Sequence, residues 1–288
     1  MAPISVVIPA YNEAASISKV LESLKSYMRQ NNIEHEIIVI DDCSSDGTAG
    51  AAARPEVAVV SHPVNRGYGA ALTTGLKKAK YGHVLIMDAD ESYPVDDISK
   101  LMPYINDFDM VVGARQGAHY HGSPVKRMSR IIFSALLKYV TGEKVPDANS
   151  GMRIFKKDVV MQFEDDFCSG FSFTTTITII LLSNGYLTKF VPIGYMSRTG
   201  KSKVRHLRDT IRTVQILLHT IVYYNPVKAF MPFSVISALA FALSSLLYIF
   251  RRHDMLFGMA AVISFLFAML FMAFGMITYA VVKSGRKR

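Results

Sequence analysis

The sequence HVLIMDAD, which is His83-Val84-Leu85-Ile86-Met87-Asp88-Ala89-Asp90, decides the fold class of this chain. Residues 84–87 are apolar without polar alternation and too few for a helix, which is typical of a strand buried on both faces of a parallel sheet. In an extended chain, side chains two residues apart point the same way, so Asp88 and Asp90 would stand side by side and repel each other. A divalent cation between them, with an anion beyond it, would remove that repulsion. A polar turn after a strand is the alternative interpretation of an isolated Asp-x-Asp.

Strand-like and helix-like segments alternate on both sides of this stretch. Apolar strand candidates lie at residues 4–8, 36–40, 57–61, 84–88, 110–113, 154–155 and 187–193. Apolar residues at helical spacing follow the first strand at Ile17, Val20, Leu21, Leu24 and Met28. The alternation favours an α/β fold with a doubly wound, mostly parallel sheet.

Polar loops follow the first, second and fourth predicted strands. Ligands of parallel α/β sheets bind at the carboxyl ends of the strands, because these ends meet at one edge. We therefore expect polar side chains that are far apart in the sequence to converge on one crevice. These side chains are Tyr11, Glu13, Asp41, Asp42, Asp88 and Asp90.

Two long runs near the C-terminus, residues 230–250 and 255–282, contain no charged residue. Each is long enough to cross a hydrocarbon core of about 30 Å as a helix. Only Arg251-Arg252-His253-Asp254 separates them, so we expect two transmembrane helices in a hairpin. A buried core helix is the alternative for either run alone, and the tandem arrangement disfavours it.

These patterns divide the chain into an α/β domain at residues 1–200, a basic amphipathic juxtamembrane helix at 201–227, and two transmembrane helices with a basic tail at 228–288. Apolar residues at helical spacing from 207 to 222 predict a helix in the headgroup layer, and we expect the apolar segment 131–137 also to rest on the bilayer. A signal peptide would require a basic flank before its apolar segment, and residues 4–8 have no such flank. We therefore expect a multi-pass protein of the cytoplasmic (inner) membrane with its α/β domain in the cytoplasm. The basic tail agrees with the positive-inside rule, whereas Arg251 and Arg252 weigh against it.

The formal net charge of +9 raises the question of a nucleic-acid partner. The basic residues concentrate at 201–212 and in the C-terminal tail, next to the predicted membrane segments, without interleaved aromatic side chains. Anionic lipid headgroups and lipid phosphates are therefore the expected partners, and nucleic acid is not. Cys43 and Cys168 have no metal-ligand spacing, so we expect reduced thiols.

Four motifs stand in an order that resembles family 2 glycosyltransferases with the GT-A fold. They are Pro9-Ala10-Tyr11-Asn12-Glu13, Asp41-Asp42-x-Ser44-x-Asp46-Gly47-Thr48, Asn65-x-Gly67-x-Gly69-x-Ala71 and Asp88-Ala89-Asp90. The later motifs, followed by two terminal spans, are similar to the polyprenyl-phosphate glycosyltransferases, the group related to dolichol-phosphate mannose synthase and bacterial glucosyl-lipid synthases. They are Asp147-x-x-Ser150-Gly151-x-Arg153, Phe171-Ser172-Phe173-Thr174-Thr175-Thr176 and Gly200-Lys201-Ser202-Lys203. The resemblance covers nearly the whole chain.

The resemblance implies the transfer of a hexose from a nucleotide diphosphate sugar to polyprenyl phosphate, undecaprenyl or dolichyl, with inversion at the anomeric carbon. A UDP-sugar is the favoured donor and GDP-mannose the alternative. A divalent cation, Mg²⁺ or Mn²⁺, held by Asp90 and Asp88, would neutralise the pyrophosphate. The family's habit suggests a homotetramer, and Gly258 and Gly275 would allow close helix contacts.

The resemblance also assigns roles to individual residues. The expected nucleotide-sugar ligands are Pro9, Tyr11, Asn12, Glu13, Asp41, Asp42, Asp88 and Ala89, with Asp42 placed ahead of its neighbour Asp41 for base and ribose. The expected catalytic residues are Asp90, Asp147 and Arg153. The expected ligands of the acceptor phosphate are Arg115, Arg127, Arg130 and Lys203, and Arg153 is also expected to contribute to this phosphate site. The acceptor is already a phosphate with its second pKa near about 6, so it needs positioning more than deprotonation. Asp147, which matters to activity in the family, is expected to orient Arg153 or the sugar, and a plain turn aspartate is the alternative.

This chain departs from the family pattern at two positions. Cys43 stands where the family often has glycine, which predicts that this turn does not require a positive φ. Glu91-Ser92 replaces the more usual Leu-Gln after the two aspartates, so a family metal contact would be missing. Either Glu91 or Ser92 compensates, or the metal keeps an additional water.

Two other functions would be compatible with parts of this pattern. A processive polysaccharide synthase on the same fold would carry a Gln-x-x-Arg-Trp motif and more spans, and this chain contains no Trp. A catalytically silent, sugar-nucleotide-binding membrane scaffold would not need carboxylates at both strand ends.

Overall fold

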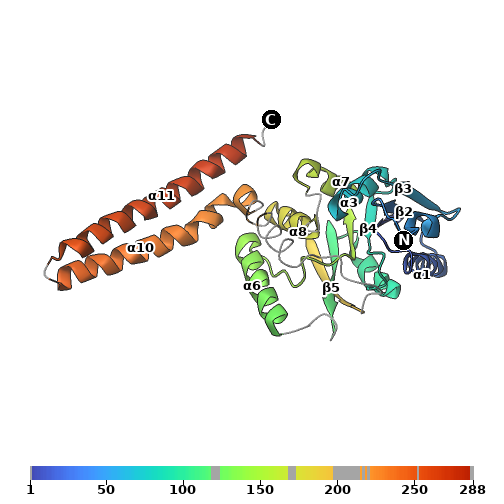
Figure 1. Cartoon of the computed structure of the whole chain (residues 1–288), viewed down its shortest axis with the longest axis horizontal. Coiled ribbons are helices and arrows are strands. Elements are labelled where there is room, and N and C mark those ends of the chain that lie inside the picture. The colour runs from blue at the N-terminus through green and yellow to red at the C-terminus, as the bar shows by residue number, and fades with distance from the viewer. Residues whose placement is uncertain are drawn as a thin grey trace. The chain divides into compact units, whose positions relative to one another are not determined.

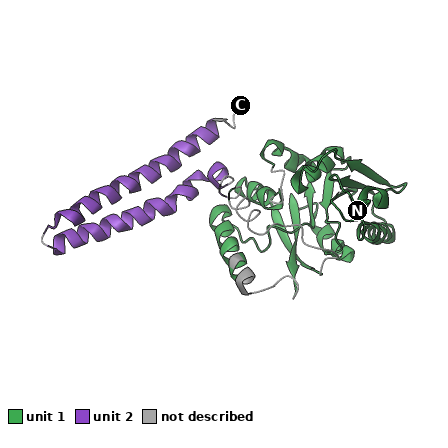
Figure 2. Cartoon of the chain, in the orientation of Figure 1, with its two compact units in different colours: residues 1–216 green, residues 217–288 purple. Residues whose placement is uncertain are grey.

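The structure is a computed structural model that describes residues 2–117, 124–167, 173–196, 221–251 and 253–285, together with residues 215 and 218, without the side chains of 124–127 and 129. The chain divides into two compact units, residues 1–216 and 217–288 (Figure 2). The first unit contains a sheet covered by helices, and the second contains two long apolar helices.

The sheet of the first unit has seven strands among the residues the structure describes (Figure 1). Their bounds are β1 Ile4–Ala10, β2 His35–Asp41, β3 Val57–Ser61, β4 His83–Ile86, β5 Met110–Gln116, β6 Arg153–Lys156 and β7 Thr188–Gly194. The order across the sheet is β3-β2-β1-β4-β6-β5-β7. Only β6 runs against its neighbours, pairing antiparallel with both β4 and β5. The predicted α/β fold with a mostly parallel sheet is confirmed.

Helices cover both faces of this sheet. The α-helices of the first unit are α1 Ile17–Gln30, α2 Thr48–Ala52, α3 Tyr68–Lys78, α4 Ile98–Leu101, α6 Pro124–Thr141, α7 Lys157–Met161 and α8 Phe173–Ser183. Among the described residues, 3₁₀ turns accompany them at η1 Val95–Asp97, η2 Met102–Tyr104 and η3 Glu164–Asp166.

The alternation of side chains along β1 divides the core into two layers. Ile4, Val6 and Ile8 pack on the face that carries α1 and α4, whereas Val7 packs on the face that carries α3, α7 and α8. Gly75 of α3 lies directly over Val7, since a Cβ at this position would overlap the Val7 side chain. Because both faces are covered, the polar groups that bind ligands are left at the edge where the strands end.

The register places the ends of the central strands together. Ala10 at the end of β1 lies beside Asp41 at the end of β2, and Val7 lies beside Ile86 at the end of β4. The strand β4 ends two residues earlier than predicted, so Asp88 and Asp90 stand in the turn beyond it rather than on extended chain. The strand-alternation argument for their common direction therefore does not apply. The turn also holds Glu91 at a φ of +60°.

The second unit contains α10, Pro226–Phe250, and α11, Met255–Gly285. The two antiparallel helices pack through the aromatic pairs Phe230–Phe274 and Phe241–Phe265, and Ser234 Oγ donates to the carbonyl of Ala268 at 2.9 Å. Both are long and apolar enough to cross a membrane, as predicted.

Segments flanking these elements were also predicted from the sequence. The apolar segment 131–137 belongs to α6, which exposes one apolar stripe. Its exposed side chains are Met128, Ile131, Ile132, Leu136 and Tyr139. The expected loop at 116–124 and the expected headgroup helix at 207–222 lie largely outside the described residues.

Candidate active site

The loops after β1 and β2 are joined by hydrogen bonds between their side chains and backbone. The Asn12 backbone N–H donates to Ser44 Oγ at 2.9 Å, and the Ser45 N–H donates back to Asn12 Oδ1 at 2.8 Å. The Glu13 N–H donates to Thr48 Oγ1 at 2.8 Å. These bonds therefore hold the two motifs together beyond the ends of β1 and β2, where Tyr11 is 39% exposed.

Cys43 adopts a φ of +63°, so the prediction that its turn does not require a positive φ is wrong. The side chain is exposed, with Sγ 3.7 Å from the carbonyl of Pro63. The left-handed conformation costs a residue other than glycine about 1–2 kcal/mol. Cysteine therefore occupies a position for which the backbone favours glycine.

The carboxylate of Asp42 forms hydrogen bonds with other groups of the protein. It accepts the backbone N–H groups of Arg66 at 2.9 Å and Gly67 at 2.7 Å, and it contacts His62 Nδ1 at 2.7 Å. Gly67, at a φ of +94°, begins α3, so these bonds hold the turn that starts the helix. Asp42 and His62 are both buried, which leaves Asp42 a structural role.

Asp41 differs from Asp42 in that one of its carboxylate oxygens could accept a hydrogen bond from a ligand. Its side chain is 4% exposed, and Oδ2 accepts the Ser44 N–H at 3.4 Å. Within the described part of the chain, Asp41 Oδ1 is buried and has no hydrogen-bond partner. A buried carboxylate oxygen without a donor is costly, so Asp41 is the better candidate for contacting a ligand, in place of the predicted preference for Asp42.

Asp88 and Asp90 are each oriented by a hydroxyl group. Tyr68 Oη donates to Asp88 Oδ1 at 2.9 Å. Ser92 donates both its backbone N–H, at 3.1 Å, and its hydroxyl to Asp90 Oδ1. Ser92 is thus turned toward Asp90. Burial, and then the Asp88 charge, hold the pKa of Tyr68 well above its usual value, so the phenol is a neutral donor.

This donor set fits a Mg²⁺ or Mn²⁺ ion that is bound together with a nucleotide. The described residues contain no group of three or more His, Cys, Asp or Glu side chains that could bind a metal. Mg²⁺ is commonly held by only one or two carboxylates, with substrate phosphates and water completing its coordination. Asp88 and Asp90 would supply those carboxylates, and the serine at 92 supports Asp90.

Arg115 and Asp147 form a paired group on the other side of the site. Arg115 Nε lies 2.7 Å from Asp147 Oδ2, and Nη2 lies 2.9 Å from Oδ1. The guanidinium also lies 5.2 Å from the ring centroid of Tyr195. Asp147 therefore forms its direct hydrogen bonds with Arg115 and not with Arg153, which was one of its two predicted targets, and it influences Arg153 through its charge. The other predicted target, the sugar, stays a prediction.

Arg153 is fully buried in β6, in the middle of the sheet. Its guanidinium donates to the carbonyls of Ala148, Ser150 and Thr174 and to the hydroxyl of Thr178, which occupies all five of its N–H groups. Burial lowers the pKa of Arg153 to about 10, while Asp147 acts in the opposite direction. The expectation that Arg153 binds the acceptor phosphate is therefore corrected: it fastens the 147–151 loop to α8.

The other predicted residues are distributed as follows. Pro9 is part of β1, and Ala89 is buried in the turn after β4. Arg130 is partly exposed on α6. Lys203 and the side chain of Arg127 lie outside the described residues, so Arg115 is the predicted acceptor ligand whose surroundings the structure gives in detail.

Sequence reasoning missed Tyr68, Tyr93 and Thr178. Tyr68 occupies a variable position of the Asn65-x-Gly67-x-Gly69 motif, where its place on the first turn of α3 is the available signal. Tyr93 Oη accepts the backbone N–H of Gly151 at 2.6 Å. Burial raises the pKa of Tyr93, with the Arg115 charge opposing the shift and the Asp88 charge adding to it.

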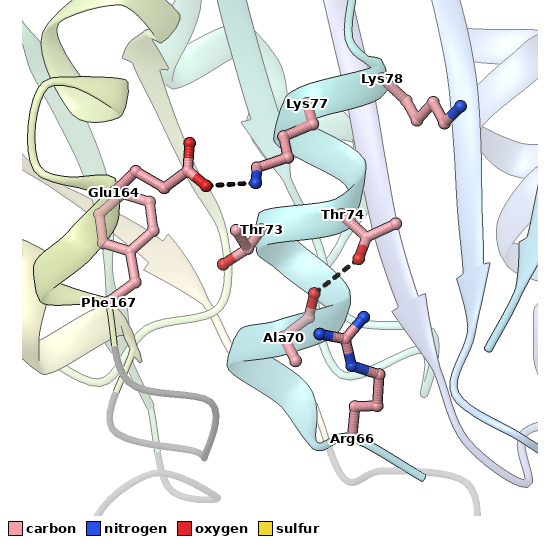
Figure 3. A pocket seen from close by; sticks show the side chains of 8 residues that line it. All are labelled: Arg66, Ala70, Thr73, Thr74, Lys77, Lys78, Glu164 and Phe167. Carbon is pink, nitrogen blue, oxygen red and sulfur yellow. Dashed lines mark hydrogen bonds and ion pairs between the residues drawn. The ribbon is translucent and has the colours of Figure 1, made fainter. Parts of the chain in front are cut away.

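A pocket of about 340 Å³ lies along α3. Figure 3 shows its lining, and the Lys77–Glu164 ion pair spans it. Thr74 connects it to the site, because Thr74 Oγ1 lies 2.9 Å from His62 Nε2, and His62 contacts Asp42. Lys78 points away from Lys77 in this view. None of the residues that were predicted for the site lines this cavity.

A profile described as glycosyl transferase family 2 matches residues 5–163. The chain is 29% identical over 221 residues to the low-salt glycan biosynthesis hexosyltransferase Agl6 of Haloferax volcanii, covering 75% of this chain but only 53% of that protein. It is 30% identical over 255 residues to the undecaprenyl-phosphate 4-deoxy-4-formamido-L-arabinose transferase of Edwardsiella ictaluri, covering 86% of this chain and 77% of the relative.

Among solved structures, the fold matches glucosyl-3-phosphoglycerate synthase from Mycobacterium tuberculosis in complex with Mn²⁺, UDP and phosphoglyceric acid. The TM-score is 0.61 at 22% identity, over 76% of this chain and 78% of that one. At this identity, the likeness shows the fold alone.

Proposed function

The chain belongs to glycosyl transferase family 2, and we propose that it transfers a hexose from a nucleotide diphosphate sugar to polyprenyl phosphate. The observation that carries this proposal is the place of the Arg115–Asp147 pair, which presents a cation to the same sheet edge as Asp41, Asp88 and Asp90. The similarity to an undecaprenyl-phosphate transferase over 86% of this chain supports the same acceptor class. The product would be a lipid-linked sugar that donates to cell-surface glycans or glycoproteins.

The nucleotide would lie against the ends of β1 and β2. The unpaired Asp41 Oδ1 would accept a hydrogen bond from the base or the ribose, and the exposed ring of Tyr11 offers a surface for the base. Asp42 would act indirectly, by holding the turn before α3. A UDP-sugar is the favoured donor, and GDP-mannose is the alternative.

The proposed cofactor is Mg²⁺ or Mn²⁺, with Asp88 and Asp90 as its protein ligands. When bound, such an ion neutralises the diphosphate that becomes the leaving group. Tyr68 and Ser92 keep the two carboxylates oriented before the nucleotide arrives, so less reorganisation is needed on binding.

The acceptor phosphate would bind at Arg115. One of its oxygens forms a bond to the anomeric carbon, and the bond from that carbon to the nucleotide diphosphate breaks with the electron pair leaving on the diphosphate, which inverts the configuration. The acceptor oxygen carries no proton at cytoplasmic pH, so no general base is required. Asp147 is accordingly assigned to positioning Arg115, whose planar fork suits a phosphate.

The membrane supplies the acceptor in this proposal. Helices α10 and α11 would span the cytoplasmic membrane as parts of segment 228–288, and residues 201–227 would form the juxtamembrane helix, with the catalytic domain, residues 1–200, on the cytoplasmic side. The exposed apolar stripe of α6 would contact the same bilayer. A homotetramer is proposed from the family resemblance.

Product analysis separates this function from its alternatives. The full chain in detergent is incubated with each nucleotide sugar, Mn²⁺ and polyprenyl phosphate, and the organic phase is examined by mass spectrometry. One hexose on each lipid phosphate supports the proposal. A polymer would indicate a processive synthase, and nucleotide binding without any glycolipid would indicate a silent scaffold.

A further inference from the structure

The carboxylate of Asp88 is held between two groups that come from opposite sides of the site. Tyr68, on the first turn of α3, donates its hydroxyl to Asp88 Oδ1 at 2.9 Å. Gly151, in the loop before β6, lies against the same carboxylate. A Cβ at Gly151 would stand 2.7 Å from both Cγ and Oδ1 of Asp88, and closer still to Oδ2. No residue other than glycine fits at position 151 unless the Asp88 side chain moves.

The position of Gly151 is itself fixed by buried hydrogen bonds. Its backbone N–H donates to Tyr93 Oη at 2.6 Å, and Tyr93 is 4% exposed. The preceding carbonyl, that of Ser150, accepts from both Nε and Nη2 of the buried Arg153. The Asp88 carboxylate therefore lies against a backbone segment that buried hydrogen bonds hold in place.

We propose that Tyr68 and Gly151 are positioning residues for the candidate metal ligand Asp88, and that Gly151 links the direction of this carboxylate to the loop that carries Asp147. The inference rests on the proposed function in one respect, the binding of a divalent cation at Asp88. It adds a physical connection between the donor side of the site and the pair that faces the acceptor.

The connection between Asp88 and the Arg115–Asp147 pair follows from the chain segment between Asp147 and Gly151. Asp147 is fastened to Arg115, Ala148 and Ser150 are fastened to Arg153, and Gly151 is fastened to Tyr93. These bonds restrict the conformations that the segment 147–151 can adopt. A displacement at Gly151 would consequently move the carboxylate on which the cation binds.

Two substitutions test the proposal on the full chain in detergent. Tyr68→Phe removes one hydroxyl, and Gly151→Ala adds one methyl group against the carboxylate. Groups that orient metal ligands typically change metal affinity by about 10- to 100-fold, so we expect each variant to weaken Mn²⁺ binding by about tenfold or more. The readout is the dissociation constant of Mn²⁺ in the presence of UDP, followed by electron paramagnetic resonance of free Mn²⁺.

Matched controls lie at the opposite end of β4. Tyr81→Phe removes a hydroxyl that donates to Glu34 at 2.9 Å, and Gly82→Ala adds a methyl group where nothing lies within 4 Å. Both controls should bind Mn²⁺ as the unmodified chain does. Thermal unfolding without metal, and UDP binding in the presence of a chelator, identify variants whose loss is merely structural.

The inference is overturned if variants that unfold at the unmodified temperature retain the unmodified dissociation constant for Mn²⁺, or if the unmodified chain binds no Mn²⁺ with UDP. Should Gly151→Ala not fold, Tyr68→Phe decides alone. Weakened Mn²⁺ binding in the variants supports the inference even if no lipid-linked sugar forms in any assay. Absence of a lipid-linked sugar would instead contradict the proposed transfer to polyprenyl phosphate.

Discussion

Arg115 and Asp147 form a two-point ion pair, with Nε 2.7 Å from Oδ2 and Nη2 2.9 Å from Oδ1. The Asp147 side chain is 3% exposed and that of Arg115 is 17% exposed, so the aspartate is the buried support and the arginine is the group presented. We propose on this basis that the aspartate of the Asp147-x-x-Ser150-Gly151 motif positions Arg115, a role that needs no proton transfer.

Replacement of Arg115 should affect the acceptor and not the donor. Charge-assisted hydrogen bonds contribute about 1.5–3 kcal/mol, so Arg115→Ala should raise the KM for polyprenyl phosphate by roughly 10- to 100-fold. UDP affinity, measured by calorimetry, should stay unchanged. Asp109→Asn, which removes the ion pair with Lys156 away from the site, is the control. A loss of UDP affinity in Arg115→Ala would assign this arginine to the donor instead.

Asp41 and Asp42 should respond differently to the same substitution. Asp41→Asn should weaken nucleotide binding while leaving the unfolding temperature near that of the unmodified chain, because Oδ1 has no partner within the described residues. Asp42→Asn should lower the unfolding temperature, because it weakens the bonds to Arg66, Gly67 and His62. Thermal unfolding with and without UDP measures both effects. The opposite pattern would return the nucleotide contact to Asp42.

Arg153 should prove essential for folding and not for acceptor binding. Arg153→Met breaks this hydrogen-bond network and leaves the buried carbonyls of Ala148 and Ser150 without their guanidinium donor, and each unsatisfied buried carbonyl costs about 1–3 kcal/mol. Lysine would not restore it, because its ammonium cannot reproduce the planar fork. The unfolding temperature of the full chain in detergent measures the loss, with the 67%-exposed Arg29 as the matched Arg→Met control. A normally stable Arg153→Met with a raised KM for lipid phosphate would reinstate the original prediction.

Cys43→Gly should stabilise the protein. At a φ of +63°, removal of the side chain relieves about 1 kcal/mol of backbone strain, although the greater freedom of glycine in the unfolded chain offsets part of this. Urea unfolding measures the difference, and Cys43→Ala, which keeps a Cβ, should show no such gain. Equal stabilities of the two variants would mean that the left-handed backbone is not strained.

The fold and the edge residues could be predicted because they depend on local patterns. Unbroken apolar runs such as 84–87 identify buried strands, and the loops that follow parallel strands must meet at one edge. The end of β4 was placed two residues late, because the apolar run continues through Met87 after the ladder to β6 has ended at Ile86. The pattern of apolar residues indicates which residues are buried, but it does not indicate where the hydrogen-bonded pairing of two strands ends.

The roles within the site depended on contacts that the sequence does not encode locally. Arg153 is buried because β6 lies antiparallel between β4 and β5, a placement that no spacing reveals. Asp42 is occupied because Gly67 directs the next turn back onto it. The pairing of Asp147 with Arg115, in place of Arg153, follows from the same topology.

Transfer of the sugar to the lipid phosphate is the central step of the proposed function. The most direct measurement incubates the purified full chain with a radiolabelled nucleotide sugar, Mn²⁺ and polyprenyl phosphate, and counts the label that enters the organic phase. We predict mild-acid-labile labelled glycolipid with the unmodified chain and with Asp109→Asn, and background label with Asp90→Asn. No organic-phase label from any nucleotide sugar, or full activity in Asp90→Asn, would contradict the proposed reaction or its metal site.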